Sequence, residues 1–188
     1  MTTESLSALG SGSVEGVFLI SGIPGAGKTT VARLLASQFP LGAHIEADEI
    51  QNLIVSGGLH PQEEPREEAL RQLRLRTRNV SLLADSFATA RIVPVIDDTV
   101  VERQRFENYL TDLQTRPLRL VLLSPPLEIA LARDEGRLFK GVGHIWSHLD
   151  AVMRKEMVGL GLWLDTSAQT PQQTLAAIIG QLPKTLVG

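Results

Sequence analysis

The sequence predicts a three-layer α/β/α fold built on a five-stranded parallel sheet. Short apolar segments alternate with longer stretches in which apolar residues recur at helical spacing, as they do where helices join parallel strands. The first apolar segment runs into a glycine-rich turn that opens a helical stretch. Later apolar segments end in or near aspartate, which predicts acidic side chains at the carboxyl edge of the sheet, where ligands bind in such folds.

The glycine-rich turn at residues 21–30, SGIPGAGKTT, completes the pattern G-x-x-x-x-G-K-[ST] of a phosphate-binding loop. Its glycines let successive backbone N–H groups curl around an anion. Lys28 would reach the β- and γ-phosphates of a nucleotide, and the Thr29 hydroxyl would complete the shell of a Mg²⁺ ion. A buried-strand pattern at residues 17–20 and a helical pattern at residues 30–39 flank the turn in the required order. The predicted nucleotide-binding residues are Gly22, Gly25, Ala26, Gly27, Lys28, Thr29 and Thr30.

Asp48 follows the second strand candidate, residues 43–47, at the sheet edge beside the phosphate-binding loop. We therefore expect it to face a ligand. In an alternative and compatible interpretation, Asp48 caps the helix expected over residues 49–55, because Asp48 and Gln51 fit a capping pattern.

Two further elements follow Asp48. Residues 56–65 contain two glycines and two prolines and predict a loop long enough to close over a substrate. Residues 66–90 predict a long helix. We expect most of its arginines to lie on a solvated face; they include Arg71, Arg74, Arg76 and Arg78.

The third strand candidate, residues 92–96, ends in Asp97 and Asp98. An apolar strand ending in aspartate commonly holds or orients Mg²⁺ in phosphate-loop proteins. We favour Asp97, the first residue past the strand, as the one that faces the nucleotide, and an alternative is a turn with a helix cap. The predicted metal ligands are Thr29, Asp97 and Asp98. Pro94 cannot donate to a sheet ladder, so regular pairing is expected to begin at Val95.

After Asp98 the sequence predicts a helix at residues 101–113, a strand at 118–123 and a short helix at 127–133. The segment that follows, residues 133–143, combines three cations with three glycines. This composition predicts a mobile lid that brings positive charge to phosphates, although a solvated loop is the alternative. His144 and His148 are four residues apart, but without a third ligand we assign them to a helix surface or core.

The remaining chain predicts a last strand at residues 161–165 and a last helix that ends near residue 182. Thr170, Pro171 and Gln173 provide the cap of that helix.

Length and composition favour a single domain at residues 17–188 after a loose tail at residues 1–16. Zero cysteines exclude thiolate metal sites, and no apolar run is long enough to cross a bilayer. A net charge of −3 offers no broad attraction for nucleic acid. We therefore expect a soluble, cytoplasmic monomer or homodimer that acts on a small molecule, without nucleic acid or membrane as partner.

The segments GIPGAGKTT, EADEI, VIDDT, RDEGR and LWLDTS together resemble P-loop small-molecule kinases of the nucleoside-monophosphate-kinase-like group. The chain is most similar to chloramphenicol phosphotransferase-like and gluconate-kinase-like enzymes, which are AAA-type P-loop phosphotransferases, over nearly all residues after Gly16. This resemblance implies a P-loop NTPase fold with a short lid, and ATP and Mg²⁺ as cofactors.

The same resemblance implies residue roles. Asp48 matches the acid that takes the proton from the substrate hydroxyl, and Asp97 and Asp98 match acids near Mg²⁺ and the acceptor. Arg133 and Arg137 match lid arginines that stabilise the transferring phosphoryl group. The implied reaction is in-line transfer of the ATP γ-phosphate to an alcohol. The predicted catalytic residues are Lys28, Asp48, Asp97, Arg133 and Arg137.

Two other functions stay open on the sequence. One is a kinase that acts on a nucleotide, a nucleotide-sugar or a nucleic-acid end. The other is a nucleotide-binding switch or ATPase that acts on a partner protein. An aromatic content of 4% disfavours a nucleic-acid acceptor, because single strands bind to stacking aromatics in a basic channel.

Overall fold

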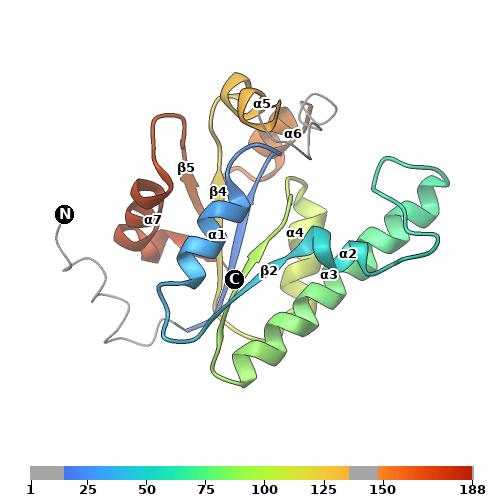
Figure 1. The fold of residues 1–188 in the computed structure, drawn as a ribbon, viewed down its shortest axis with the longest axis horizontal. Coiled ribbons are helices and arrows are strands. Elements are labelled where there is room, and N and C mark those ends of the chain that lie inside the picture. The colour runs from blue at the N-terminus through green and yellow to red at the C-terminus, as the bar shows by residue number, and fades with distance from the viewer. Residues whose placement is uncertain (1–14, 136–147, 188) are drawn as a thin grey trace.

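The computed structural model of the chain describes residues 15–135 and 148–187, and Figure 1 shows their arrangement. The strands are β1 (Val17–Gly22), β2 (Gly42–Glu46), β3 (Val93–Asp97), β4 (Leu118–Leu123), β5 (Leu162–Leu164) and β6 (Leu186–Val187). The α-helices are α1 (Lys28–Ala36), α2 (Ala47–Asn52), α3 (Arg66–Thr89), α4 (Arg103–Asp112), α5 (Leu127–Glu135), α6 (His148–Glu156) and α7 (Pro171–Gly180). A short 3-10 helix, η1 (Leu182–Thr185), precedes β6.

Five strands form a parallel sheet in the order β2-β3-β1-β4-β5, which confirms the predicted sheet. A sixth strand that the sequence analysis missed, β6, runs antiparallel to the start of β4. It pairs through Leu118 and Arg119, whereas β5 pairs with the other end of β4, Val121 to Leu123. Two residues are too few to show an alternating pattern, so β6 gave no signal in the sequence.

Helices cover both faces of the sheet and confirm the three layers. In Figure 1, α1 and α7 lie on one face, and α3 and α4 lie on the other. Every residue of β1 is buried, as expected for a central parallel strand that helices cover on both sides. The phosphate-binding loop between β1 and α1 therefore follows a strand that is buried along its whole length.

Pro94 affects the two neighbours of β3 differently. The ladder between β3 and β1 begins at Val95, which pairs with Phe18, as the missing N–H of the proline predicts. The ladder between β3 and β2 extends further back, to the pair of Val93 with Gly42. The prediction for Pro94 is therefore confirmed on the β1 side and wrong on the β2 side.

The cap of the last helix is confirmed in detail. Thr170 accepts a hydrogen bond from the backbone N–H of Gln173 at 3.2 Å, and the Gln173 side chain accepts one from the backbone N–H of Thr170 at 2.8 Å. None of the helices within the described ranges combines the length and apolar character needed to cross a bilayer.

Candidate active site

The phosphate-binding loop has the backbone conformation that its glycines predict. Gly25 has a φ of 79°, and a Cβ built at this position would lie 2.0 Å from the carbonyl oxygen of Ala130 on α5. Only glycine fits a left-handed backbone in such close contact with another chain segment. Gly27, with a φ of 98°, precedes the first residue of α1. The ammonium group of Lys28 donates to the carbonyl oxygen of Ile23 at 3.3 Å, so it lies folded over the loop.

Three neighbouring strands bring their carboxyl ends to this loop. Glu46 of β2 pairs with Asp97 of β3, and Asp97 pairs with Ile20 of β1. The end of β3 is also tied to β1, because the Ser21 hydroxyl accepts from the backbone N–H of Val100 and donates to its carbonyl oxygen, both at 2.9 Å. Sequence reasoning gave Ser21 no role beyond its place in the loop.

Asp97 and Asp98 point to opposite faces of the sheet, as successive residues of an extended chain do. Asp97 lies on the α1 face, where one of its carboxylate oxygens is 3.6 Å from Nε2 of His44. Asp98 lies on the other face, toward α3 and α4. The structure therefore brings Asp97, and not Asp98, to the side of the sheet that carries the phosphate-loop helix.

Asp98 is part of a buried charge network. One of its oxygens accepts from Arg76 at 2.7 Å, and the other accepts from Arg105 and from the Tyr109 hydroxyl, both at 2.9 Å. Burial opposes ionisation, but the charges of Arg76 and Arg105 outweigh it and lower the pKa of Asp98. Burial and the Asp98 charge raise the pKa of Tyr109 well above its ordinary value. Both oxygens of Asp98 are thus engaged by side chains of α3 and α4, on the face of the sheet opposite α1.

Arg76 links this network to Asp48. Its second terminal nitrogen donates to an Asp48 oxygen at 2.9 Å, and its side chain is 5% exposed. Arg76 is therefore an exception to the expectation that most α3 arginines lie on a solvated face. The capping interpretation of Asp48 is also wrong, because Glu46 occupies the N-cap position and Asp48 lies inside α2. The Asp48 side chain is 62% exposed, so its carboxylate is held by Arg76 but open to solvent.

The loop between α2 and α3 is held by two buried glutamines. The amide of Gln72 donates to the carbonyl oxygen of Gly57 at 2.9 Å, and its oxygen accepts from the backbone N–H of Leu59 at 2.8 Å. Gln51 donates to the carbonyl oxygen of Leu59 at 3.1 Å. These contacts place the predicted substrate loop beside α2 and the start of α3 (Figure 1).

Arg133 anchors the loop after β5 instead of extending into solvent. It donates to the carbonyl oxygens of Thr166 and Ser167 at 2.8 and 3.2 Å. The Thr166 hydroxyl in turn donates to the carbonyl oxygen of Ala26 in the phosphate-binding loop at 3.4 Å. Arg137, His144 and most of the predicted lid at residues 133–143 lie outside the described residues.

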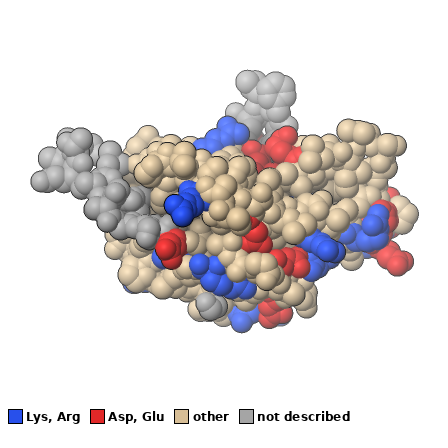
Figure 2. Space-filling view, turned by 90° about the horizontal axis from the view of Figure 1, so that it is seen from below, with Lys and Arg blue, Asp and Glu red and all other residues tan. Residues whose placement is uncertain are grey.

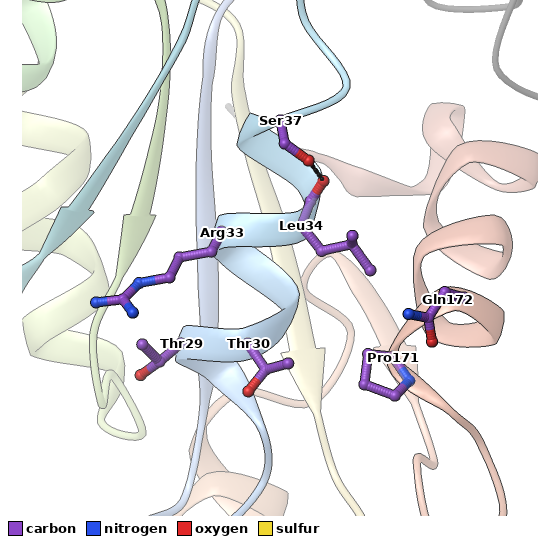
Figure 3. A pocket seen from close by; sticks show the side chains of 7 residues that line it. All are labelled: Thr29, Thr30, Arg33, Leu34, Ser37, Pro171 and Gln172. Carbon is purple, nitrogen blue, oxygen red and sulfur yellow. Dashed lines mark hydrogen bonds between the residues drawn. The ribbon is translucent and has the colours of Figure 1, made fainter.

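A pocket of about 480 Å³ lies between α1 and the start of α7 (Figure 3). In this view Thr30 and Leu34 lie on the side of Pro171, whereas Arg33 extends the other way. The pocket begins at the first turn of α1, directly after Lys28, so it adjoins the phosphate-binding loop. Its lining residues are Thr29, Thr30, Arg33, Leu34, Ser37, Pro171 and Gln172.

Solved structures that include a sugar kinase and a gluconokinase share this fold. A sugar kinase from Janibacter sp. HTCC2649 aligns with a TM-score of 0.69 at 20% identity, over 90% of this chain and 95% of its own. A tunicamycin resistance protein from Deinococcus radiodurans aligns with a TM-score of 0.63 at 22% identity, over 93% and 99%. A gluconokinase from Sinorhizobium meliloti 1021 aligns with a TM-score of 0.61 at 17% identity, over 89% and 93%.

Comparison with curated protein sequences finds no significant match. A family model described as an AAA domain matches residues 17–155, which include the phosphate-binding loop, Asp48 and Asp97. This range covers more than half of the chain and agrees with the resemblance that the motifs indicated. The chain therefore belongs to this AAA domain family and has the fold of the nucleoside-monophosphate-kinase-like P-loop proteins.

Proposed function

We propose that the protein is an ATP- and Mg²⁺-dependent phosphotransferase that moves the γ-phosphate of ATP to a hydroxyl group of a small molecule. The observation that carries the proposal is the position of Asp48. Its exposed carboxylate stands just past the end of β2, held by Arg76, at the same sheet edge as the phosphate-binding loop. A base placed opposite a phosphate donor is what transfer to an alcohol requires.

The donor side would use the phosphate-binding loop. Its N–H groups, the N-terminus of α1 and Lys28 would hold the phosphates. The pocket between α1 and α7 adjoins these groups and has room for other parts of a nucleotide. The likeness in fold to a sugar kinase and a gluconokinase supports a phosphate donor of this kind.

A Mg²⁺ ion would neutralise charge on the β- and γ-phosphates. The residues present fit such an ion, because Asp97 carries a buried carboxylate oxygen without a hydrogen-bond partner and Thr29 lies in the first turn of α1, directly after Lys28. Asp97 and Thr29 would hold the ion. We leave Asp98 out of this set because its oxygens accept from two arginines and a tyrosine.

Asp48 would accept the proton of the acceptor hydroxyl, and Arg76 would orient it. Positioning matters most here, because the transition state of phosphoryl transfer is loose and its charge is spread over several oxygens. Arg133 would act through the loop that it holds against Ala26, and Arg137 would supply charge to the transferring group. We infer these roles of Arg133 and Arg137 from the resemblance in sequence to the lid arginines of such kinases.

The acceptor would be a small molecule and not a polynucleotide. On the face shown in Figure 2, Lys and Arg side chains are interspersed with Asp and Glu instead of forming a continuous basic strip. Electrostatic binding of a nucleic-acid backbone needs such a strip.

The test is a phosphate-transfer screen of the purified chain with Mg-ATP against antibiotics, sugar acids, nucleosides and nucleoside monophosphates. The proposal expects a phosphorylated product that forms only with its acceptor. Lys28→Ala should abolish turnover, whereas Asp48→Asn should keep ATP binding and lose transfer. Near-normal transfer by Asp48→Asn would show that Asp48 is not the base. Stabilisation by ATP without transfer to any acceptor would instead favour the switch or ATPase alternative.

A further inference from the structure

A second group of polar side chains lies beneath α1, next to the phosphate site. Glu46 and Asp97 are cross-strand partners in β2 and β3, and His44 precedes Glu46 by two residues, so all three share one face of the sheet. One ligand atom from each lies within 4.8 Å of the others. His44 Nε2 and a carboxylate oxygen of Asp97 are 3.6 Å apart, which suits two ligands of one ion, since ligands at about 2.1 Å from a metal are about 3–4 Å apart.

The unpaired oxygen of Asp97, which the nucleotide-linked Mg²⁺ would also use, faces His44 and so supports a cation at this position as well. Its side chain is 4% exposed, and the oxygen that faces His44 has no hydrogen-bond partner. Nε2 of His44 has none either. Buried polar atoms are nearly always paired, because leaving them unpaired costs free energy. A bound cation would satisfy both atoms together.

We propose that His44, Glu46 and Asp97 form a binding site for a divalent transition-metal ion, with Mn²⁺ as its representative. One imidazole nitrogen with two carboxylates suits Mn²⁺ or Zn²⁺, whereas Mg²⁺ prefers oxygen ligands and retains its waters. The site is distinct from the nucleotide-linked Mg²⁺ proposed above, because it uses His44 and Glu46 and needs no nucleotide. Only Asp97 is common to the two.

Arg33 contacts two of the three proposed ligands. Its guanidinium donates to Nδ1 of His44 and to a Glu46 oxygen, both at 3.4 Å, and its side chain is 67% exposed. The long contacts and the exposure allow it to swing into solvent when a metal enters. Coordination through Nε2 places the proton of His44 on Nδ1, which also ends the contact with Arg33. Arg33 is therefore a competitor of the metal for this site.

The experiment is a titration of the full, nucleotide-free chain with Mn²⁺, in which the electron paramagnetic resonance signal of the free ion measures binding. We expect one site per chain that excess Mg²⁺ does not empty. Loss of a direct ligand in His44→Ala or Glu46→Gln should weaken binding about tenfold or more. Arg33→Gln should strengthen it. Mn²⁺ should also broaden the imidazole resonances of His44 in the nuclear magnetic resonance spectrum at lower Mn²⁺ concentrations than it broadens those of His60.

His60→Ala and Glu49→Gln serve as matched controls, because both side chains are exposed and lie outside the site. Both controls should bind Mn²⁺ as the unmodified chain does. Binding that survives unchanged in folded Glu46→Gln and His44→Ala chains, or a His44 signal that Mn²⁺ leaves sharp, would overturn the proposal. Because no ATP is present, either result leaves the phosphotransferase proposal untouched, and failure of transfer leaves this one untouched.

Discussion

The guanidinium of Arg76 lies 2.7 Å from a carboxylate oxygen of Asp98, and both side chains are almost completely buried. The same guanidinium donates to Asp48 at 2.9 Å, so one arginine binds both a buried carboxylate and a solvent-exposed one. The charges of Asp98 and Asp48 outweigh burial and raise the pKa of Arg76. This arrangement ties the proposed base to the interior of the protein.

Arg76→Lys tests this link. Lysine keeps the charge but lacks the planar fork that lets arginine bridge two carboxylates. We expect a loss of about 1–3 kcal/mol in the free energy of unfolding, from charged hydrogen bonds that are no longer made. Urea denaturation measures the change. Arg78→Lys, at an exposed position of the same helix, should change stability by less than about 0.5 kcal/mol, and equal losses in both variants would contradict the role of Arg76.

Asp98→Asn should destabilise the fold more strongly. Removing one partner of a buried ion pair leaves uncompensated charge and typically costs about 3–5 kcal/mol. Because the pKa of Asp98 in the folded chain lies below its ordinary value of 3.8, the unfolded chain binds that proton more tightly. The stability from Asp98 is therefore complete above about pH 3.8 and is lost as the pH falls through the folded-state pKa.

Urea unfolding of the unmodified chain and of Asp98→Asn over a series of pH values tests this pH dependence. The difference in stability between the unmodified chain and Asp98→Asn should stay constant from neutral pH down to about pH 3.8 and shrink below it. A difference that grows as the solution becomes more acidic would mean that Asp98 is protonated in the folded chain.

Tyr109 can be followed alone, because it is the only tyrosine in the sequence. Burial and the charge of Asp98 raise its pKa well above the ordinary value of 10.0. The ultraviolet absorbance of phenolate should therefore appear near pH 10 in urea and only at higher pH in the folded chain. The free energy of unfolding should decline above pH 10, because the unfolded chain loses the Tyr109 proton at a lower pH than the folded chain does. Titration of both states at the same pH would show that the hydroxyl is not buried against Asp98.

Gly25→Ala tests the fit between the phosphate-binding loop and α5. The added Cβ would meet the carbonyl oxygen of Ala130 at 2.0 Å, and the left-handed backbone costs about 1–2 kcal/mol for a residue with a Cβ. Gly57→Ala carries the backbone cost at a φ of 68° but has no atom within 4 Å of its Cβ. Thermal unfolding should therefore show a larger loss for Gly25→Ala, and ATP should no longer stabilise that variant. Equal losses of stability in the two variants would show that the contact between Gly25 and α5 does not affect stability.

The sequence by itself determined the succession of the five parallel strands along the chain and the identity of the phosphate-binding loop. Both depend on local patterns, since apolar periodicity follows the geometry of a single element and the loop is one continuous segment. It also identified Asp48 and Asp97 as residues at the carboxyl edge, because parallel strands end on a common edge. The cap formed by Thr170 and Gln173 was predictable for the same local reason.

The tertiary structure alone decided which of these polar groups meet. Arg76 is separated from Asp48 by 28 residues, and His44 and Asp97 belong to different strands, so no local pattern pairs them. Arg76, one arginine among several on α3, is buried beside Asp98 and Asp48, and the charges of these neighbours offset the cost of burial. Asp97 and Asp98 lie in different environments because an extended chain turns successive side chains to opposite faces of the sheet. Such contacts depend on packing between distant elements, which a single sequence does not reveal.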